Sequence, residues 1–567
     1  MTRLRRIEIR HFRSIAQFVW CPGPGLNALI GSGDAGKSSV LDAIDLCLGA
    51  RRNVVFGDDD FFGMNVDQPI VIEITVGELD DALKNLEAYG LYLRGFRAED
   101  GAVVDEPEVR CETVLTVRLT VQSDLEPQWQ LVSDRAAAQG QTRHLAWADR
   151  LRIAPGKLGA RGDENLSWRR GSVLNRLSDE RADASAALVR AGREARLRFG
   201  DDAQAQLGQA LKQVLETANQ LGVPVGDQVK ALLDAHAISV SGGAIALHNA
   251  GGVPLRSLGL GSARLLVAGL QRAAAADTSV LLVDEIETGL EPHRIYRLLV
   301  TLGAKEQAPP LQVFLTTHSP VVVRELSGTQ LYVLRQHNGV HLAHCCGNED
   351  DVQGTMRRYP EALLGKSILV CEGASEVGLI RGMDQASNQP SISTFGVVLV
   401  DGSGSSAVQR ALAFQKLGYR VALLRDSDVP PKLEEEGFKA AGGAVFAWRA
   451  PNALEDELFQ ALDGMAVAKL WDLIKEQSDL DVLDGQLRTA SGNVLNVAAV
   501  DAAMLQRPGP DLRRILGKAA RSKHNAWFKS VTDMERIARE IVAHGFEQSD
   551  LQFKTEINRI FGWCWNG

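Results

Sequence analysis

The sequence predicts an α/β protein in which a nucleotide-binding domain is followed by a second domain built on a parallel sheet. Three observations carry this prediction. A glycine-rich loop at residues 31–38 joins an apolar run to a helix-like segment, and a strand-like run at 279–285 ends in two carboxylates. Further along, three apolar runs alternate with helix-like segments. Each of these runs ends in an acidic residue. Strands that alternate with helices usually form a parallel sheet.

Length and composition set limits on the architecture and on the partners. A chain of 567 residues is too long for one core, so three or four domains are expected. Hydrophobic residues make up 45% and charged residues 23%, as in ordinary globular proteins. The net charge of −9 argues against a basic coat over the whole surface. A local basic groove for nucleic acid stays open, because binding depends on where the charge lies.

The sequence predicts a cytoplasmic protein with no membrane partner. No apolar stretch approaches the roughly 18–20 residues that span a bilayer. The N-terminal segment alternates between polar and apolar residues where a signal peptide would have an apolar core. The seven cysteines include no C-x-x-C pair, so neither a disulfide framework nor a zinc knuckle is expected.

The loop Gly-Ser-Gly-Asp-Ala-Gly-Lys-Ser at 31–38 matches the phosphate-loop pattern G-x-x-x-x-G-K-[ST]. The apolar run at 26–30 would deliver the loop, and the helix expected at 37–48 would offer its N-terminal amides to phosphate. The lysine would reach the β- and γ-phosphates of ATP, and the serine hydroxyl would ligate Mg²⁺. The expected ATP contacts here are Gly31, Gly33, Gly36, Lys37, Ser38 and Ser39.

Two strands far downstream supply further groups for this nucleotide. The strand at 279–283 ends at Asp284, which would hold Mg²⁺, and Glu285, which would polarise the attacking water as general base. The next strand, at 312–316, ends shortly before His318, which we expect near the γ-phosphate.

The segment Leu-Gly-Leu-Gly-Ser-Ala-Arg-Leu-Leu at 258–266 lies just before the acidic strand. In the ATP-binding-cassette (ABC) superfamily this place holds the signature loop and helix. The chain resembles the SMC and RecF-like branch of that superfamily, whose opening strand continues into Phe-Arg-Ser as residues 12–14 do here. Gly259 stands where the signature serine is typical, with Ser257 and Ser262 nearby. Which hydroxyl meets the γ-phosphate therefore stays open.

The resemblance also implies how copies of the chain assemble. The signature loop, including Gly261, would cap the ATP bound by a second copy, so a homodimer or larger homo-oligomer is expected. About 250 residues separate the phosphate loop from the acidic strand. This interval is expected to contain strands at 70–76 and 112–121 and a helix-like segment at 174–236. We interpret this helix-like segment as a dimerisation arm, with simple core helices as the alternative.

The second half of the chain presents carboxylates at the ends of its predicted strands. Glu372 follows the first strand, and Asp426 and Asp428 form a D-x-D at the end of the third. The carboxyl ends of parallel strands line one crevice, so these side chains should converge. Clustered carboxylates repel one another unless a cation neutralises them, and their oxygens suit Mg²⁺ or Mn²⁺. The three strands are expected at 367–371, 396–400 and 421–425.

This order of strand ends resembles a Toprim domain, the metal-binding module of topoisomerases, primases and some nucleases, over about residues 365–462. Following an SMC-like ATPase, it closely resembles the OLD (overcoming lysogenization defect) family of ATPase-plus-Toprim nucleases. The resemblance implies a DNA endonuclease that uses two divalent ions and acts in defence against phage or foreign DNA. It also implies DNA as a partner and leaves room for a helicase-like or other defence protein.

The family's site residues carry over by motif. Glu372 and Glu376 match its Glu-Gly-x-x-Glu element, and Asp426 and Asp428 match its D-x-D; these residues would bind the two metal ions.

The family also has an acidic element after the D-x-D and a lysine near the C-terminus. We choose Glu455 for the acidic element and leave Asp456 and Glu457 open. For the lysine, which would stabilise the transition state, we favour Lys529 over Lys523.

The leading alternative is a non-cleaving SMC/RecF-like DNA-repair ATPase, which predicts no metal-dependent cleavage. A topoisomerase would need a nucleophilic tyrosine, and none of the six tyrosines stands in an evident catalytic setting. The predicted parts are an ABC-type ATPase at 1–173 and 237–345, its helical insertion at 174–236, a Toprim domain at 360–465 and a helical segment at 466–567.

Overall fold

Contacts between residues divide the chain into two compact units. One consists of Met1–Ala28 and Ser38–Thr317, and the other of Leu29–Lys37 and His318–Gly567. Most of the helical arm expected at 174–236, and also Lys523, lie outside the described residues. The computed structural model describes residues 2–51, 53–159, 166, 172–174, 190–191, 193–194, 198–199, 207–218, 226–228, 247–275, 279–348, 350–430, 433–522 and 525–566.

An antiparallel group of strands forms one part of the first unit. Its strands pair in the order β6, β5, β7, β4, β1, β2, and β8 pairs with β7 as well. Apolar residues alternate along β1 and β4, so that Ile7, Ile9, Ile72 and Ile74 are fully buried. The bounds are β1 (Arg3–Phe12), β2 (Ile15–Trp20), β4 (Ile70–Gly77), β5 (Arg94–Arg97), β6 (Ala102–Val104), β7 (Glu112–Val121) and β8 (Pro127–Leu131).

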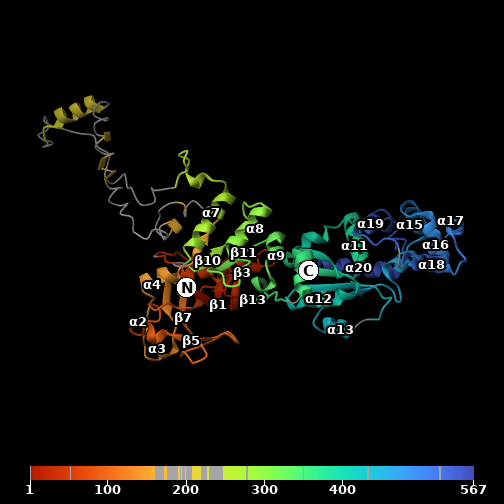
Figure 1. Cartoon of the computed structure of the whole chain (residues 1–567), viewed down its shortest axis with the longest axis horizontal. Helices are drawn as coiled ribbons and strands as arrows, with labels where there is room; N and C mark the ends of the chain where they lie inside the picture. Colours follow the sequence, from red (N-terminus) through yellow and green to blue (C-terminus); the bar gives the residue numbers. More distant parts are fainter. Residues whose placement is uncertain are drawn as a thin grey trace. The chain divides into compact units, whose positions relative to one another are not determined.

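A parallel group of strands in the first unit includes the strand that precedes the acidic pair at 284–285. β10 lies between β9 and β11, with Val280 opposite Gln312. All four residues of β10 are buried, as expected for a parallel strand covered on both faces. Helices α7 and α8 pack against each other beside these strands (Figure 1). The bounds in this group are β9 (Gly156–Leu158), α7 (Leu260–Ala273), β10 (Val280–Val283), α8 (Pro292–Thr301) and β11 (Gln312–Thr316). The first unit also contains the short helices α2 (Leu86–Tyr89), α3 (Asp134–Ala138) and α4 (Trp147–Ile153).

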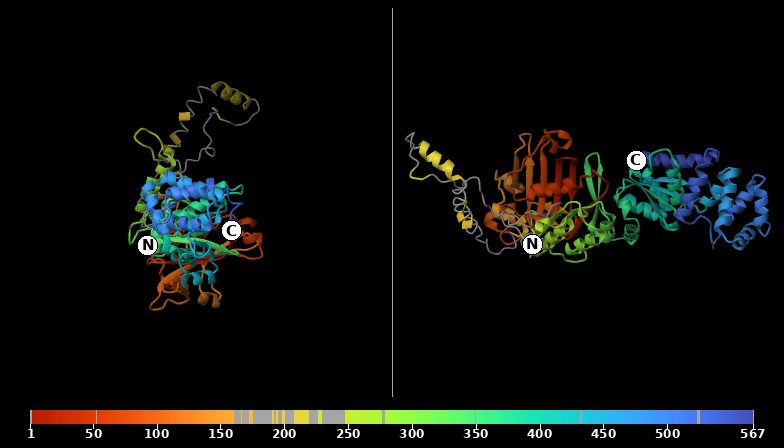
Figure 2. Two further views of the ribbon diagram at one scale, coloured as in Figure 1. Left: turned by 90° about the vertical axis from the view of Figure 1, so that its right-hand side faces the viewer. Right: turned by 90° about the horizontal axis from the view of Figure 1, so that it is seen from above.

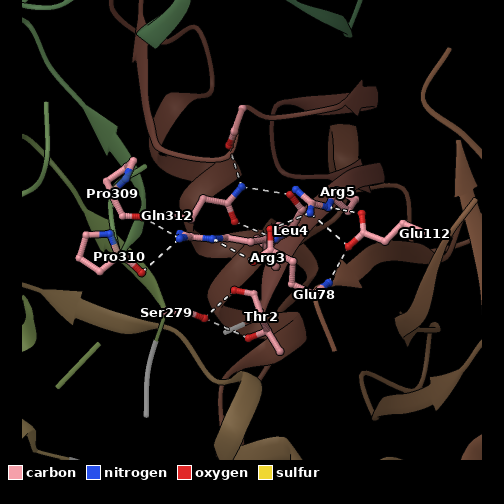
Figure 3. Close-up of polar contacts among 11 residues, drawn as sticks. Thr2, Arg3, Leu4, Arg5, Glu78, Glu112, Ser279, Pro309, Pro310 and Gln312 are labelled. Atoms are coloured by element: carbon pink, nitrogen blue, oxygen red, sulfur yellow. Dashed lines mark hydrogen bonds and ion pairs between the residues drawn. The ribbon is translucent and has the colours of Figure 1, made fainter. Parts of the chain in front are cut away.

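The opening strand is fixed to β11 by a buried amide (Figure 3). Oε1 of Gln312 accepts a hydrogen bond from the backbone N–H of Leu4 (2.7 Å), and Nε2 donates to the carbonyls of Leu4 (3.0 Å) and Gly23 (2.8 Å). Arg3 donates to the carbonyl of Pro309 (2.8 Å) close by. A buried amide is stable only when its donors and acceptor are satisfied, so this contact sets the position of β1 on the parallel strands.

The second unit contains a four-stranded, wholly parallel sheet in the order β15, β14, β16, β17. Helices α11 and α12 cover its opposite faces (Figure 1). The strand order reverses beside β14, so the crevice at the carboxyl ends of β14 and β16 is the place where such sheets bind ligands. The bounds are β14 (Ser367–Cys371), α11 (Ala374–Ala386), β15 (Val397–Asp401), α12 (Ala407–Lys416), β16 (Arg420–Arg425), α13 (Leu433–Ala440) and β17 (Ala444–Ala447).

Helices complete the second unit. The last of them lies against the sheet, where the Arg420 guanidinium stacks 4.0 Å from the centroid of the Trp563 ring and donates to the carbonyl of the same residue (2.7 Å). Helix α18 packs against both α14 and α16, and α16 packs against α17, in the blue part of the chain (Figure 2). The remaining bounds are α9 (Pro320–Glu325), β12 (Leu331–His337), β13 (Val340–Cys345), α10 (Asp350–Arg358), α14 (Leu454–Ala461), α15 (Gly464–Gln477), α16 (Leu480–Ser491), α17 (Val497–Met504), α18 (Pro510–Ala520), α19 (Val531–Ile537) and α20 (Leu551–Trp565).

The strands and helices that the sequence predicts for the motifs are confirmed. The glycine-rich loop lies between β3 (Leu26–Ile30) and α1 (Lys37–Leu48), and the acidic pair at 284–285 directly follows β10. The chain after residue 466 is mainly helical, as expected. Over the residues that the structure describes, no helix combines the length and the apolar character needed to cross a bilayer.

Candidate nucleotide site and carboxylate cluster

The phosphate loop is curled over its own lysine. Nζ of Lys37, a side chain that is 5% exposed, donates to the carbonyls of Gly31 (3.2 Å) and Ser32 (2.7 Å). Gly31 has a φ of 133°, and a Cβ there would lie 2.9 Å from the carbonyl oxygen of Leu334, so only glycine fits. Gly36 also has a positive φ, of 82°. A bound phosphate would offer the ammonium a charged partner in place of these carbonyls.

The two residues expected to hold Mg²⁺ lie side by side in the first unit. The Ser38 hydroxyl donates to Oδ1 of Asp284 (3.1 Å), although 246 positions separate them in the sequence. The Thr316 hydroxyl, at the end of β11, donates to the same oxygen (2.5 Å) and accepts from the backbone N–H of Glu285 (2.8 Å). Glu285 adopts a φ of 44°, which turns the chain sharply after Asp284. Both carboxylates are exposed, as groups that meet a ligand must be.

Arg264 holds this turn through hydrogen bonds to its carbonyl groups. The sequence analysis assigns no role to this residue. The residue is fully buried in α7. Its Nη1 donates to the carbonyls of Glu285 (3.1 Å) and Thr288 (2.9 Å), and its Nη2 to the carbonyl of Asp284 (3.3 Å). One side chain thereby joins the signature helix to the acidic turn. The role of Arg264 could have been predicted only from the presence of an arginine on the apolar face of a predicted helix.

The predicted signature segment begins α7. Gly259 is the N-cap residue, and Gly261 is buried with its Cα so close to Gly289 that a Cβ would lie 2.7 Å from the Gly289 carbonyl oxygen. Close packing inside a single chain is therefore enough to require glycine at position 261, without a contact to ATP of a second copy. Ser262 accepts from Arg294 (3.3 Å), and the Ser257 hydroxyl donates to the Pro254 carbonyl (2.6 Å). The choice of hydroxyl for the γ-phosphate stays open.

The remaining predicted ATP contacts stay predictions. His318 is exposed just after β11, in the second unit. Gly33 is exposed at the tip of the phosphate loop, and Ser39 is half-buried in the first turn of α1.

The second unit brings the predicted carboxylates together at the carboxyl ends of β14 and β16. The backbone N–H of Asp426 donates to Oε2 of Glu372 (2.8 Å), which joins the two strand ends. Glu376 caps α11 by accepting from the N–H of Gly373 (2.9 Å), and Oδ1 of Asp426 accepts from the N–H of Leu454 at the start of α14 (3.0 Å). The cluster is therefore built from two strand ends and two helix starts.

Burial and electrostatic repulsion within the cluster raise the pKa values of two of its carboxyl groups. Burial, with the charges of Glu455 and Glu372, raises the pKa of Glu376 to about 7. Burial, followed by the charges of Glu376 and Glu372, raises the pKa of Asp426 to about 9. A cation among these groups would lower both pKa values, because it favours the charged forms.

A lysine from the C-terminal region reaches the cluster. Nζ of Lys529 lies 2.5 Å from Oε1 of Glu455, whose side chain is 1% exposed. Burial acts to lower the pKa of the lysine, but the charge of Glu455 outweighs it, and the pKa of Lys529 is raised. Among the described residues, Oε2 of Glu455 has no hydrogen-bond partner although it is buried. Such an orphaned acceptor calls for a ligand, an ion or a water molecule.

The neighbours of Glu455 on α14 have different partners. Glu457 turns away from the cluster and pairs with Arg449 (3.0 Å). Asp456 lies 2.9 Å from Nε of Arg521, and Nη1 of that arginine lies 3.2 Å from Oδ2 of Asp428. The sequence analysis did not single out Arg521, because no local motif marks it.

The carboxylates do not form a ready-made metal site. Within the part of the chain that the structure describes, no group of three or more histidine, cysteine, aspartate or glutamate side chains is set to hold a metal ion. Backbone amides hold Glu372, Glu376 and Asp426, whereas Lys529 and Arg521 neutralise Glu455 and Asp428. A divalent ion would have to replace some of these contacts.

Comparison with known proteins shows the family of the chain. A family model described as "AAA domain, putative AbiEii toxin, Type IV TA system" matches residues 26–324, more than half of the chain. The chain belongs to this AAA-domain family. No match was found among curated proteins. The match includes the phosphate loop, Asp284, Glu285 and His318, so the predicted ATP-binding ATPase is confirmed at the level of the AAA-domain family.

The chain is also similar to solved structures of SMC heads and of RecF. One is an SMC head bound to the C-terminal winged-helix domain of ScpA, at 16% identity and a TM-score of 0.32, covering 60% of this chain and 96% of that one. The SMC head domain from Thermotoga maritima has 13% identity and a TM-score of 0.30, with 60% and 98% covered. The recombination mediator RecF, solved with an ATP analogue, has 12% identity and a TM-score of 0.30, with the same shares covered.

The AAA-domain match ends at residue 324, before the carboxylate cluster. The prediction of a Toprim nuclease domain, and with it the membership of the OLD family, stays a prediction. The expected two-ion site and the defence role also stay predictions.

Proposed function

We propose that this member of the AAA-domain family is a divalent-metal-dependent DNA endonuclease coupled to an ATPase of the SMC/RecF type, as in the OLD family. The observation that carries the proposal is the carboxylate cluster at the switch point of the parallel sheet. Burial, together with the charges of the other members, raises the pKa of Asp426 to about 9, and Lys529 reaches the cluster from a separate segment. Repulsive groups of this kind, gathered in a crevice, are typical of functional sites rather than of stable cores.

The donors fit Mg²⁺ or Mn²⁺. All are carboxylate oxygens, which hard cations prefer, and Oε2 of Glu455 is buried without a hydrogen-bond partner among the described residues. Two bound ions would stabilise the attacking and leaving oxygens of a phosphodiester. Lys529 would contribute positive charge beside the phosphate once it leaves Glu455. The residues proposed to hold the ions are Glu372, Glu376, Asp426, Asp428 and Glu455.

The ATPase part would act as a regulator in a homodimer. Lys37 would bind the phosphates, Ser38 and Asp284 would hold one Mg²⁺, and Glu285 would orient the attacking water. The segment at Gly261 would meet ATP held by a second copy, because signature and phosphate loops of one such domain cannot close on the same nucleotide.

Defence against phage or foreign DNA is the proposed biological role. The matched family's description includes a putative toxin of a toxin–antitoxin system. A DNA-cutting enzyme released from control would be toxic to its own host, so the two descriptions are compatible.

The test is cleavage of supercoiled plasmid by the full chain with Mg²⁺ or Mn²⁺ and with EDTA. We expect metal-dependent cutting that is lost in Asp426→Asn, which keeps the shape of the side chain but removes a charge. Glu434→Gln, at an exposed position of α13, is the matched control and should cut normally. Cutting that survives Asp426→Asn would sink the assignment of the site. No cutting by any protein would favour the non-cleaving DNA-repair ATPase.

A further inference from the structure

Arg521 joins two parts of the carboxylate cluster. It is the C-cap residue of α18, with 34% of its side chain exposed. Its Nε lies 2.9 Å from Oδ2 of Asp456, and its Nη1 lies 3.2 Å from Oδ2 of Asp428. Helix α18 approaches α14 so closely that a Cβ on Gly517 would lie 2.5 Å from Oδ1 of Asp456. The packing of the two helices therefore delivers the guanidinium to the cluster.

The two aspartates of the D-x-D differ in how they are held. Oδ1 of Asp426 accepts from a backbone amide, that of Leu454 at the start of α14. Asp428, 33% exposed, instead pairs with the side chain of Arg521. Arginine side chains that are partly exposed exchange partners readily, because water screens their ion pairs. Asp428 is thus the more easily released of the two.

We propose that Arg521 is an internal counter-ion that a divalent cation must displace from Asp428, so that this arginine sets the metal affinity of the cluster. The inference rests on the proposed function. Without metal, Arg521 supplies positive charge to Asp428 and Asp456. A metal ion at Asp428 offers the same neutralisation at shorter range, and it competes with the guanidinium for the same oxygen.

The opposite role makes the opposite prediction. If Arg521 mainly positioned Asp428 and Asp456 for the metal, its removal would weaken binding. If it is a competitor, its removal leaves both carboxylates unneutralised and strengthens binding. From the modest strength of partly exposed ion pairs, we expect Arg521→Gln to bind Mn²⁺ roughly twofold to fivefold more tightly.

The experiment is calorimetric titration of the full chain with Mn²⁺ at pH 8 without nucleotide, using Asp426→Asn to identify the signal from the cluster. Arg514→Gln, on the same helix at a 75% exposed side chain, is the matched control and should bind as the wild type does. Arg521→Lys keeps one charge but cannot span both carboxylates, and it should fall between the wild type and Arg521→Gln. Thermal unfolding establishes that each variant is folded.

Unchanged or weaker Mn²⁺ binding in Arg521→Gln would overturn the inference. Should that variant fail to fold, Arg521→Lys decides in the same way, with affinity equal to or below wild type counting against the inference. A wild-type titration indistinguishable from that of Asp426→Asn would instead show that the cluster binds no metal. That result would remove the proposed nuclease function itself, so the two failures are distinguishable.

Discussion

The Thr316 hydroxyl donates to Oδ1 of Asp284 at 2.5 Å and accepts from the backbone N–H of Glu285 at 2.8 Å. One buried side chain at the end of β11 therefore orients the Asp284 carboxylate and the backbone of Glu285. The register of the two parallel strands, with Val283 opposite Leu315, brings these groups together. The acidic turn depends on its neighbour strand for its geometry.

Replacing Thr316 with valine should impair ATP hydrolysis without unfolding the chain. Valine keeps the shape but leaves the Glu285 N–H without its acceptor, which costs about 1–3 kcal/mol for a buried group. A misplaced pair of carboxylates should slow hydrolysis on the order of tenfold to a hundredfold. Phosphate release measures the rate, and Thr301→Val, at a half-buried site on α8, is the control. Wild-type hydrolysis in Thr316→Val would contradict the assigned role.

Lys37→Ala should abolish most ATP hydrolysis. The ammonium is buried against the carbonyls of Gly31 and Ser32, in reach of the phosphates that the loop would hold. Loss of such a preorganised cation costs on the order of a hundredfold or more in rate. Lys84→Ala, at an exposed position, should hydrolyse normally. The plasmid assay on Lys37→Ala then reveals whether ATP activates or restrains cleavage, and unchanged hydrolysis would refute the nucleotide site.

Lys529→Gln should lose plasmid cleavage while keeping ATP hydrolysis. Lys529 is the cation that reaches Glu455 in the cluster, and a cation beside a phosphate under attack typically contributes on the order of a hundredfold. Lys518→Gln, at an exposed position on α18, controls for loss of general surface charge. Normal cleavage by Lys529→Gln would reduce the lysine to a structural partner of Glu455.

The metal-free chain should lose stability as pH rises from about 4 to 9. The pKa of Asp426 rises from an ordinary value near 3.9 to about 9 on folding, and that of Glu376 rises to about 7. Folded protein therefore holds protons that unfolded protein has released, and stability falls with pH across this window.

This dependence can be measured as the unfolding temperature in EDTA at pH 6 and pH 9. Asp426→Asn should show a smaller decrease between the two, because its side chain has no proton to lose. Mn²⁺ should raise the unfolding temperature more at pH 9 than at pH 6, because fewer protons compete for the carboxylates there. Equal pH dependence in the wild type and Asp426→Asn would argue against the raised pKa.

The local features of the sequence predicted the framework of both units. The phosphate loop, the acidic end of β10 and the strand ends at Glu372 and Asp426 are short patterns, in which a few neighbouring residues specify a strand, a turn and a functional group. The parallel sheet then follows from the alternation of strands and helices. Even the convergence of Glu372 with Asp426 could be predicted, because the carboxyl ends of parallel strands share an edge.

The tertiary structure alone decided which side chains support these groups. Arg264, Thr316 and Arg521 act on residues that lie close in space but belong to other elements, and no local pattern identifies the groups that they contact. The same holds on α14, where successive residues point about 100° apart. Packing against α18 and the segment before α19 directs Glu455 to Lys529 and Asp456 to Arg521, a choice that the run of acidic residues in the sequence leaves open.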